Sequence, residues 1–590
     1  MLRKGAELFP DNLFLQVELL QQEAELKEKG VTETLEALLR LIEPFRKGIE
    51  ERTRINFEEI AAQGKQGVEE ENWANVLRTA RVLTNVLRPE EIYQADKSQV
   101  EPHLSSYLLR DFTARYPGNP SASELTPPIE ITWQQWKPEG IEEISDSQDL
   151  IVEDFDLDGR LDICILRLER LDIYSREPEG ETWNKILGID LPQGYQRLMA
   201  VDLDNDFEES GGIPVPQRGD AKPPCQSADL DIIVYGSAGI SAIENRYDSK
   251  VNKRELSAKP FADGLNSQTA VRAASTGDLD GDGDLDLVVG RTGSLEIWSN
   301  RGGMDFYDIS NRSSLPSNCA MNSILIVDAD QDVDQDVLLL GGENNGLLVN
   351  QRHGRFQWVK NTEETAELLS HIVDAEPRGM SRRFGRGVLT ADETGVSEIF
   401  PFSSSEAGSP DKRVLSESAV RRLKILDLDN NGVSDFISWG EAGLIGHVMQ
   451  LASRVPNRRA TWVPQESLAV EGRILGADYG DLDRDGDLDL IWCDEKGLHG
   501  VTNEGGNRNH WLDLSLIAQQ IKESGPTASG RVNSHGMGSN VELKTGRDYQ
   551  SVVVSRPTTH FGLGNRERVD VCRILWANGI PANLIDPNQN

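Results

Sequence analysis

The chain has 590 residues, and its 98 acidic residues outnumber its 61 lysines and arginines to give a formal net charge of −37. This balance argues against a nucleic acid as a partner, and the length predicts two to four domains. No apolar run approaches the length of a membrane span. The five cysteines are scattered without a CxxC motif, so we expect buried free thiols at Cys164, Cys493 and Cys572 and no disulfide framework.

Residues 1–115 carry leucines at helical spacing among Glu and Lys, and they predict a helical region. Within it, the stretch 6–44 predicts two helices joined by a turn at Lys29-Gly30, and it resembles one tetratricopeptide-type repeat. Trp73–Leu87 predicts a further helix of that kind. The resemblance implies a peptide or protein partner for this region. An ordinary helical hairpin packed on the next domain explains the same pattern, because a true array needs about three repeats to be stable alone.

Residues 116–128 are rich in Pro, Gly and Ser and predict a linker. From Ile129 onward the sequence changes to short alternating strands. The first residues, Met1 to Lys4, lead into a polar helical pattern rather than an apolar signal region. Either the protein is not exported by that route, or this chain lacks the start of its natural precursor.

The most informative stretch is Asp278–Asp286, which has aspartates at positions 1, 3, 5 and 9 of a nonapeptide and glycines between them. An apolar strand, 287–289, follows directly. So much negative charge in nine residues is unfavourable unless a cation neutralises it. Glycine at position 6 allows the sharp turn that such a loop needs.

Related stretches begin at residues 154, 202, 328, 390, 427 and 481. The second is interrupted by an insertion, after which Asp231 is its predicted closing ligand. The fifth, Thr390–Glu398, lacks a carboxylate at positions 1 and 5, so we expect it to bind no ion. The predicted ligands of the six remaining loops, with position 7 contributing its backbone carbonyl, are Asp154, Asp156, Asp158, Arg160 and Asp162; Asp202, Asp204, Asp206 and Asp231; Asp278, Asp280, Asp282, Asp284 and Asp286; Asp328, Asp330, Asp332, Asp334 and Asp336; Asp427, Asp429, Asn431, Val433 and Asp435; and Asp481, Asp483, Asp485, Asp487 and Asp489.

Oxygen-only ligands at alternating positions suit Ca²⁺, which accepts six to eight oxygens, better than Mg²⁺, which demands octahedral geometry. An EF-hand is excluded because it needs Glu at position 12 and a following helix, and a dockerin-type loop fails for the same reason. Tandem nine-residue β-roll repeats are also excluded, because they would follow one another directly, whereas these loops recur about every 50 residues. Acidic surface turns without an ion remain the alternative. Sites of this type bind on the order of 10⁻⁴–10⁻³ M, as in extracellular modules.

The loops recur about every 50 residues with several strands in each unit, which is typical of a β-propeller. The full motif DxDxDGxxD followed by an apolar strand stands at residues 154–162, 278–286 and 481–489, and it resembles the FG-GAP/VCBS repeats of integrin-α-like propellers. The resemblance implies a mainly β, seven-bladed propeller over residues 129–506 with about six Ca²⁺ sites. The last unit lacks one strand, which either 129–136 or 510–516 could supply.

The C-terminal stretch, 507–590, departs from the repeat and suggests a small β-sandwich. It resembles the ASPIC/UnbV domain through Asn509 to Leu512, His560 to Gly564, and Val571 to Trp576 with Asn578-Gly579. The usual proline after the tryptophan is Ala577 here, which puts only the local turn in doubt. That family has no settled biochemical role, so the resemblance names a domain and not an activity.

We find no HExxH, GxSxG or P-loop motif, and His560 is better interpreted as fixing a tight turn than as catalytic. The leading hypothesis is a non-catalytic, Ca²⁺-binding scaffold that presents a propeller face to a protein or carbohydrate. The second hypothesis is a propeller hydrolase or lyase acting on polysaccharide or phospholipid. Weak Ca²⁺ sites would stay empty at cytosolic calcium, so we expect an extracellular, periplasmic or cell-surface location.

Overall fold

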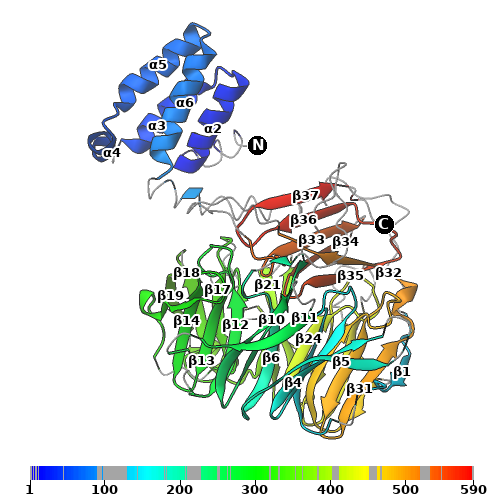
Figure 1. Ribbon diagram of the computed structural model, residues 1–590. Helices are drawn as coiled ribbons and strands as arrows, with labels where there is room; N and C mark the ends of the chain where they lie inside the picture. The colour runs from blue at the N-terminus through cyan, green and yellow to red at the C-terminus, as the bar shows by residue number, and fades with distance from the viewer. Residues whose placement is uncertain are drawn as a thin grey trace. The chain divides into compact units, whose positions relative to one another are not determined.

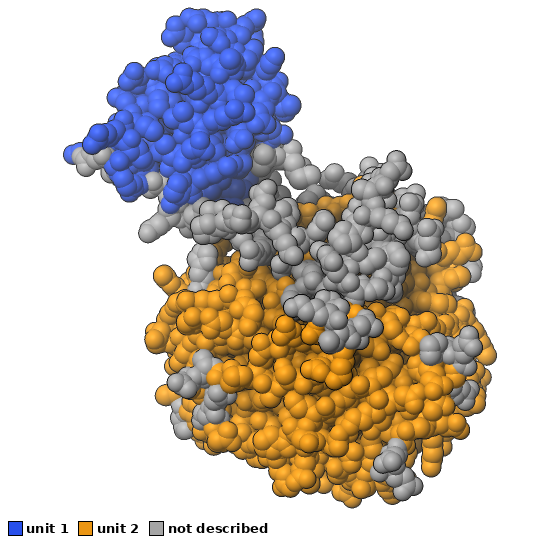
Figure 2. All heavy atoms as spheres, viewed as in Figure 1, with its two compact units in different colours: residues 1–115 blue, residues 116–590 orange. Residues whose placement is uncertain are grey.

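The computed structural model describes residues 12–43, 46–89, 129–141, 144–177, 182–205, 227–248, 253–261, 268–317, 321–329, 332–352, 354–361, 363–381, 385–400, 411–450, 461–465, 468–518, 532–545 and 548–585, with a few isolated residues between them. The chain divides into two compact units, residues 1–115 and 116–590, which Figure 2 colours blue and orange. The predicted linker, 116–128, lies outside the described residues.

The first unit contains five described helices: α2 (Leu13–Leu26), α3 (Val31–Ile42), α4 (Arg46–Thr53), α5 (Phe57–Glu69) and α6 (Trp73–Leu87). The predicted helix pair in 6–44 and the predicted helix at 73–87 are confirmed. Asparagines begin three of the helices, and each accepts a bond from a backbone N–H of the first turn, as Asn12 does from Leu15 at 2.9 Å. Leu20, Leu35 and Leu83 pack in one core between the helices.

The second unit is mainly β. Within the described residues between 133 and 503, seven antiparallel sheets of four or five strands follow one another along the chain (Figure 1). In sheet order they are β2 (Ser147–Glu153), β3 (Asp162–Arg167), β4 (Arg170–Arg176), β5 (Trp183–Asp190); β6 (Tyr195–Val201), β9 (Asp231–Gly236), β10 (Gly239–Asp248), β11 (Lys253–Lys259); β12 (Val271–Gly277), β13 (Asp286–Arg291), β14 (Ser294–Asn300), β15 (Phe306–Asp308); β16 (Ser323–Val327), β17 (Asp336–Leu340), β18 (Gly346–Asn350), β19 (Phe356–Lys360); β20 (Asp374–Ser381), β21 (Gly385–Asp392), β22 (Gly395–Phe400), β23 (Asp411–Ser416); β24 (Arg422–Leu426), β25 (Asp435–Trp439), β26 (Gly443–Gln450), β27 (Thr461–Pro464), with β28 (Val470–Glu471) on β26; and β29 (Ile474–Gly480), β30 (Asp489–Asp494), β31 (Gly497–Asn503) and β1 (Trp133–Trp136).

The strand that follows each acidic loop is buried along nearly its whole length, as every residue of β13 and β17 is. Such strands read as continuous apolar runs because neighbouring sheets cover both of their faces. The fourth strand of a sheet is more exposed, as in β11. Apolar clusters fill the spaces between consecutive sheets, and one of them joins the seventh sheet to the first through Ile491 and Ile163. The fold is therefore propeller-like.

The seventh sheet takes its fourth strand from the other end of the chain. β1 pairs antiparallel with β31, and Trp133 lies opposite Asn503. Of the two strands that the sequence offered for this role, 129–136 supplies it. His510–Ser515 (β32) pairs instead with β35 (Thr558–Gly564).

The C-terminal region forms a two-stranded sheet, β32–β35, and a four-stranded sheet of β34 (Asp548–Val553), β33 (Asn540–Thr545), β36 (Val571–Leu575) and β37 (Pro581–Ile585) (Figure 1). Its buried residues Phe561 and Leu543 share one apolar cluster with Leu203, which follows β6 of the second sheet, and with Leu287 of the third sheet. We call residues 510–585 the C-terminal β region. It packs on the propeller-like sheets through a continuous core.

The prediction of a fifth, degenerate acidic loop at Thr390–Glu398 is wrong. These residues end β21, form a two-residue turn and begin β22, with Asp392 paired to Gly395. Asp392 Oδ1 accepts the N–H groups of Thr394 and Gly395 at 2.7 and 3.0 Å. The acidic residue and the glycine in this stretch therefore form a hairpin turn and not a metal-binding loop. The connection from the first to the second strand of this sheet is residues 382–384, and its sequence contains no acidic residue.

Two smaller predictions are also answered. Cys164, Cys493 and Cys572 are buried free thiols, as expected. None of the helices that the structure describes is long and apolar enough to cross a bilayer.

Candidate metal centres in the acidic loops

Each acidic loop connects the first strand of its sheet to the second, and the aspartate at position 9 is the first residue of the second strand. The backbone is left-handed at position 4 and at position 6, as with φ of 76° at Gly281 and 93° at Gly283 in the third loop. Four loops meet this requirement at position 6 with glycine, but the fourth loop has Val333 there with φ of 84°. A β-branched residue in this conformation is strained.

Hydrogen bonds to aspartate side chains hold the third loop in shape. Asp278 accepts the N–H groups of Gly281 and Asp282 on Oδ1, at 2.9 and 3.1 Å, and that of Gly283 on Oδ2 at 3.1 Å. Asp286 Oδ2 accepts the N–H groups at positions 2 and 3, the shorter bond being 2.7 Å from Leu279. Position 1 therefore organises the turn, and position 9 fastens its start to the next strand.

Five loops bring three carboxylates together, with one oxygen from each lying within 4.8 Å of the others. In four of them the three come from positions 1, 3 and 9, and in the third loop they come from positions 1, 3 and 5. In the interrupted loop, Asp231 joins Asp202 and Asp204 from beyond the insertion, as the sequence predicted. The clusters are Asp154, Asp156 and Asp162; Asp202, Asp204 and Asp231; Asp278, Asp280 and Asp282; Asp427, Asp429 and Asp435; and Asp481, Asp483 and Asp489.

Other predicted ligands point their side chains elsewhere. Asp158 pairs with Arg160, and Asp334 accepts a bond from Arg352 at 3.1 Å. Asp487 accepts the N–H of Asn507 at 2.9 Å. Asp334 and Asp487 are at position 7 of their loops, so their backbone carbonyls remain candidate ligands although their side chains point away. Two further predicted ligands, Asp206 and Asp330, lie outside the described residues.

Burial disfavours the ionised form of these carboxylates. It raises the pKa of Asp162, Asp278 and Asp489 to about 8 each, and neighbouring aspartates add to the effect. The position-1 residues Asp154 and Asp481 are less buried, and desolvation raises their pKa to about 6. Carboxylates that resist ionisation by themselves are stabilised as anions by a bound divalent cation.

The donor set fits a hard cation. Asp162 Oδ1 and Asp280 Oδ1 are buried and accept no hydrogen bond from any residue that the structure describes. Asp162 as a whole is fully buried. An unsatisfied buried carboxylate oxygen is costly, and a divalent cation in the cluster would satisfy it. Bound at these loops, Ca²⁺ would supply positive charge between the first and second strands of each sheet that has an acidic loop.

Four of the six loops, the first, second, third and sixth, are also bonded to the next sheet by an asparagine. Asn300 Nδ2 donates to the carbonyl of Leu203, at position 2 of the preceding loop, at 2.7 Å. Its own backbone N–H donates to Asp286 Oδ1 at 2.9 Å. Asn245, Asn350 and Asn503 make the same pair of bonds, at 2.7–3.0 Å, to the preceding loop and to their own position-9 aspartate.

These asparagines are not among the residues that the sequence predicted for the site. The signal that identifies them is their constant distance of 14 residues after the position-9 aspartate. The exceptions are informative. Met449 occupies the equivalent position in the sixth sheet, which follows the sheet without an acidic loop. Arg176 takes the role in the first sheet and donates to Leu482 of the seventh loop at 3.1 Å.

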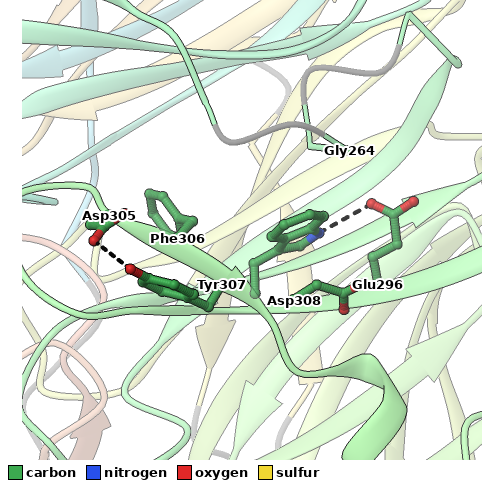
Figure 3. A pocket seen from close by; sticks show the side chains of 7 residues that line it. Gly264, Glu296, Asp305, Phe306, Tyr307 and Asp308 are labelled. Atoms are coloured by element: carbon green, nitrogen blue, oxygen red, sulfur yellow. Dashed lines mark hydrogen bonds between the residues drawn. The ribbon is translucent and has the colours of Figure 1, made fainter.

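A pocket of about 430 Å³ lies on the third sheet beside β14 and β15 (Figure 3). Its lining combines aromatic rings with carboxylates: Gly264, Glu296, Trp298, Asp305, Phe306, Tyr307 and Asp308. The Trp298 indole N–H donates to Glu296 at 3.1 Å, and the Tyr307 hydroxyl donates to Asp305 at 3.0 Å, as the dashed lines in Figure 3 show. Tyr307 is 42% exposed and Trp298 is buried.

Comparison with known proteins gives one family match, to an FG-GAP-like repeat over residues 278–339. No curated protein matches the chain. Together with the successive four-stranded antiparallel sheets, this match defines a mainly β repeat protein with a β-propeller-like fold.

Several solved structures are similar to parts of the chain. A lectin from Agrocybe aegerita that recognises non-reducing terminal N-acetylglucosamine is 15% identical over 63% of this chain and 93% of its own, with a TM-score of 0.34. The extracellular domain of a hybrid two-component system from B. thetaiotaomicron is 15% identical over 75% of this chain and 47% of its own, with a TM-score of 0.36. An exotype rhamnogalacturonan lyase is 12% identical over 63% and 75%, with a TM-score of 0.34. At these scores none of them identifies a function.

Proposed function

We propose that residues 129–506 form a closed, seven-bladed propeller whose acidic loops bind Ca²⁺ at about six sites, and that the protein is a non-catalytic scaffold for protein or glycan recognition. The fifth sheet lacks an acidic loop and takes no ion. The ring is supported by the pairing of β1 with β31 and by the bond from Arg176 of the first sheet to the seventh loop.

One observation carries the calcium assignment. Five loops, far apart in the chain, place three carboxylates within 4.8 Å of one another, although burial opposes their ionisation. Clusters of this kind are unstable as bare anions, so a cation is the simplest partner that makes them favourable. All the donors are oxygens, which favours Ca²⁺ over softer metals, and the backbone carbonyl at position 7 adds to the ligand number that Ca²⁺ accepts.

A carbohydrate is the ligand that best suits the pocket on the third sheet. The guanidinium carbon of Arg301 lies 3.9 Å from the centroid of the Tyr307 ring, and the exposed remainder of the ring would offer an apolar surface to the C–H face of a sugar. Asp305 and Asp308 line the same pocket, and carboxylates accept hydrogen bonds from sugar hydroxyls. Pockets that combine a few polar groups with aromatic walls are the usual form of a small-ligand site.

The remaining assignments follow from these. Weak calcium sites are filled outside the cytoplasm, so the scaffold acts outside the cell, in the periplasm or at the cell surface. The paired helices of the first unit, α2 with α3 and α5 with α6, resemble tetratricopeptide hairpins and would serve a peptide or protein partner. Residues 507–590 form an ASPIC/UnbV-like domain.

Two measurements test the proposal. Isothermal titration of the chelator-treated protein with CaCl₂ is expected to show several sites with affinities on the order of 10⁻⁴–10⁻³ M. A glycan array in CaCl₂ is expected to show binding that Tyr307→Ala abolishes. Tyr549→Ala is the control, because Tyr549 lies in the C-terminal β region and its hydroxyl is bonded to Glu542. Turnover of a polysaccharide or phospholipid would favour the hydrolase or lyase alternative instead.

A further inference from the structure

The C-terminal β region lies directly on the sixth acidic loop. The N–H of Gly564 donates to the carbonyl of Asn430 at 2.8 Å, and Asn509 Nδ2, one residue before this region, donates to the carbonyl of Asp429 at 2.7 Å. His560 Nε2 lies 2.6 Å from the side-chain oxygen of Asn430, and its other ring nitrogen lies 2.7 Å from Asp513. Positions 3 and 4 of the loop are therefore held from outside the propeller-like sheets.

Gly562 explains why this contact is so close. A Cβ at this residue would lie 2.1 Å from Asp427 Oδ2 and 2.4 Å from the backbone carbonyl carbon of Asn430. Any side chain would collide with the position-1 carboxylate, so only glycine lets β35 approach the loop. The segment from His560 to Gly564, which the sequence singled out without a function, is shaped to fit the sixth loop.

A second contact reaches the interrupted loop. The buried hydroxyl of Ser534 donates to Asp202 Oδ2, and the backbone N–H of Ser534 donates to Asn205 Oδ1 at 3.0 Å. Asn205 Nδ2 donates in turn to Asp284 Oδ1 of the third loop at 2.8 Å. The C-terminal β region thus orients the Asp202 carboxylate of the second cluster. It also contacts Asn205, whose side chain is bonded to Asp284 of the third loop.

The charge of the sixth cluster determines how docking of the C-terminal β region affects cation binding. Asp427, Asp429 and Asp435 are 8%, 1% and 0% exposed, and their oxygens lie within 4.8 Å of one another. Docking the C-terminal β region helps to remove these carboxylates from water, which is unfavourable for three uncompensated anions. A cation in the cluster removes that penalty. Because binding linkage is reciprocal, docking must raise the cation affinity by the same factor by which the cation favours docking.

We propose that cation binding in the second and sixth loops and docking of the C-terminal β region are one linked equilibrium, in which Ser534 and His560 are positioning residues for the loops. This inference rests on the proposed calcium binding. Arg556 provides an anchor that involves no acidic loop: its guanidinium lies 2.7 Å from Glu153 and 3.2 Å from Asp478, on the first strands of the first and seventh sheets. Removing the cation therefore loosens the region without detaching it.

Hydrogen exchange on the full chain tests the linkage. We follow the backbone amides of residues 558–564 in CaCl₂ and in chelator, and we expect exchange to be at least about 10-fold slower in CaCl₂. Ser534→Ala and Gly562→Ala are expected to lose most of this calcium-dependent protection. Ser534→Ala is also expected to lower the calcium affinity of the second loop by about 10- to 100-fold, as the loss of an outer-shell partner does. Gly562→Ala is expected to lower the affinity of the sixth loop, because its methyl group would displace Asp427.

Ser551→Ala is the matched control, because Ser551 makes a 3.0 Å bond to Asn540 inside the C-terminal β region and this bond involves no acidic loop. It is expected to keep full calcium-dependent protection. If Gly562→Ala fails to fold, Ser534→Ala carries the test alone. Calcium binding to the unaltered protein without any change in exchange at 558–564 would overturn the linkage and leave the proposed function standing. Absence of calcium binding would overturn both.

Discussion

The third and fifth sheets have the same four-stranded antiparallel order, yet only the third has an acidic loop between its first two strands. In the third sheet, Asp278–Asp286 leads from β12 into β13. In the fifth, residues 382–384 join β20 directly to β21. The strand order of a sheet therefore does not depend on the acidic loop.

The difference lies in how each sheet is joined to the next. The third loop offers the carbonyl of Leu279 to Asn350 of the fourth sheet at 2.8 Å. The fifth sheet has no such loop, and the residue of the sixth sheet that would bond to it is Met449, whose side chain has no amide. Four acidic loops are bonded to an asparagine of the next sheet, and the seventh loop is bonded to Arg176 of the first sheet. We infer that the acidic loops join neighbouring sheets rather than form the strands within one.

The largest expected effect is at position 9. In saturating CaCl₂, Asp286→Ala is expected to lower the free energy of unfolding by about 4 kcal/mol, because three N–H groups lose a charged acceptor inside a fully buried site. Asp392→Ala in the fifth sheet is the control and is expected to cost about 1 kcal/mol, since Asp392 caps a turn and forms one 3.6 Å ion pair with Lys412. Denaturant unfolding measures both, and equal costs would contradict the comparison.

The next effect concerns the bond between sheets. Asn300→Leu is expected to cost about 2 kcal/mol, because the carbonyls of Leu203 and Leu285 lose their donor. Met449→Leu places a leucine at the equivalent position of the sixth sheet, which no acidic loop precedes. It is expected to cost about 1 kcal/mol or less. A larger cost for Met449→Leu would show that the asparagine bonds do not join the sheets.

Strain at position 6 gives a smaller effect. Val333→Gly is expected to raise the free energy of unfolding by about 1 kcal/mol, because it removes a β-branched side chain from a left-handed backbone. Gly283→Val at the same position of the third loop is expected to lower it by about as much or more. Thermal unfolding in CaCl₂ compares the pair, and a destabilising Val333→Gly would show that its packing against Gly579 matters more than the strain.

The smallest effect tests the fifth sheet by pH. Burial, reinforced by the charge of Asp374, raises the pKa of Glu376 on β20 to about 7. A carboxyl with a higher pKa in the folded chain binds its proton more tightly there, so its contribution to stability is lost as the pH rises from about 4.5 to about 7.

Glu376→Gln is therefore expected to exceed the unaltered protein in stability by about 1 kcal/mol at pH 8, and not to exceed it at pH 4.5. The difference is expected to be the same in CaCl₂ and in chelator, because Glu376 belongs to no acidic loop. Unfolding by urea at the two pH values measures it. A stability difference that does not change with pH would contradict the assignment.

The sequence was sufficient where local chemistry repeats. The aspartate spacing predicted the loops and the strands after them, and Asp231 was correctly placed with Asp202 despite the insertion. It misled at Asp392, because an acidic residue followed by glycine also makes a two-residue hairpin turn. It could not reveal the docking of Gly562 on Asp427, which depends on packing between residues more than 100 positions apart.

We propose that cations bound in the acidic loops stabilise the contacts between neighbouring sheets. The most direct test is the midpoint of thermal unfolding of the full chain against free calcium, from chelator to 10 mM CaCl₂. A site with a dissociation constant on the order of 10⁻⁴ M stabilises the folded chain by about 2.7 kcal/mol at 100 times that concentration. The account predicts a midpoint that rises continuously over this range. A midpoint that is the same in chelator and in CaCl₂ would contradict it.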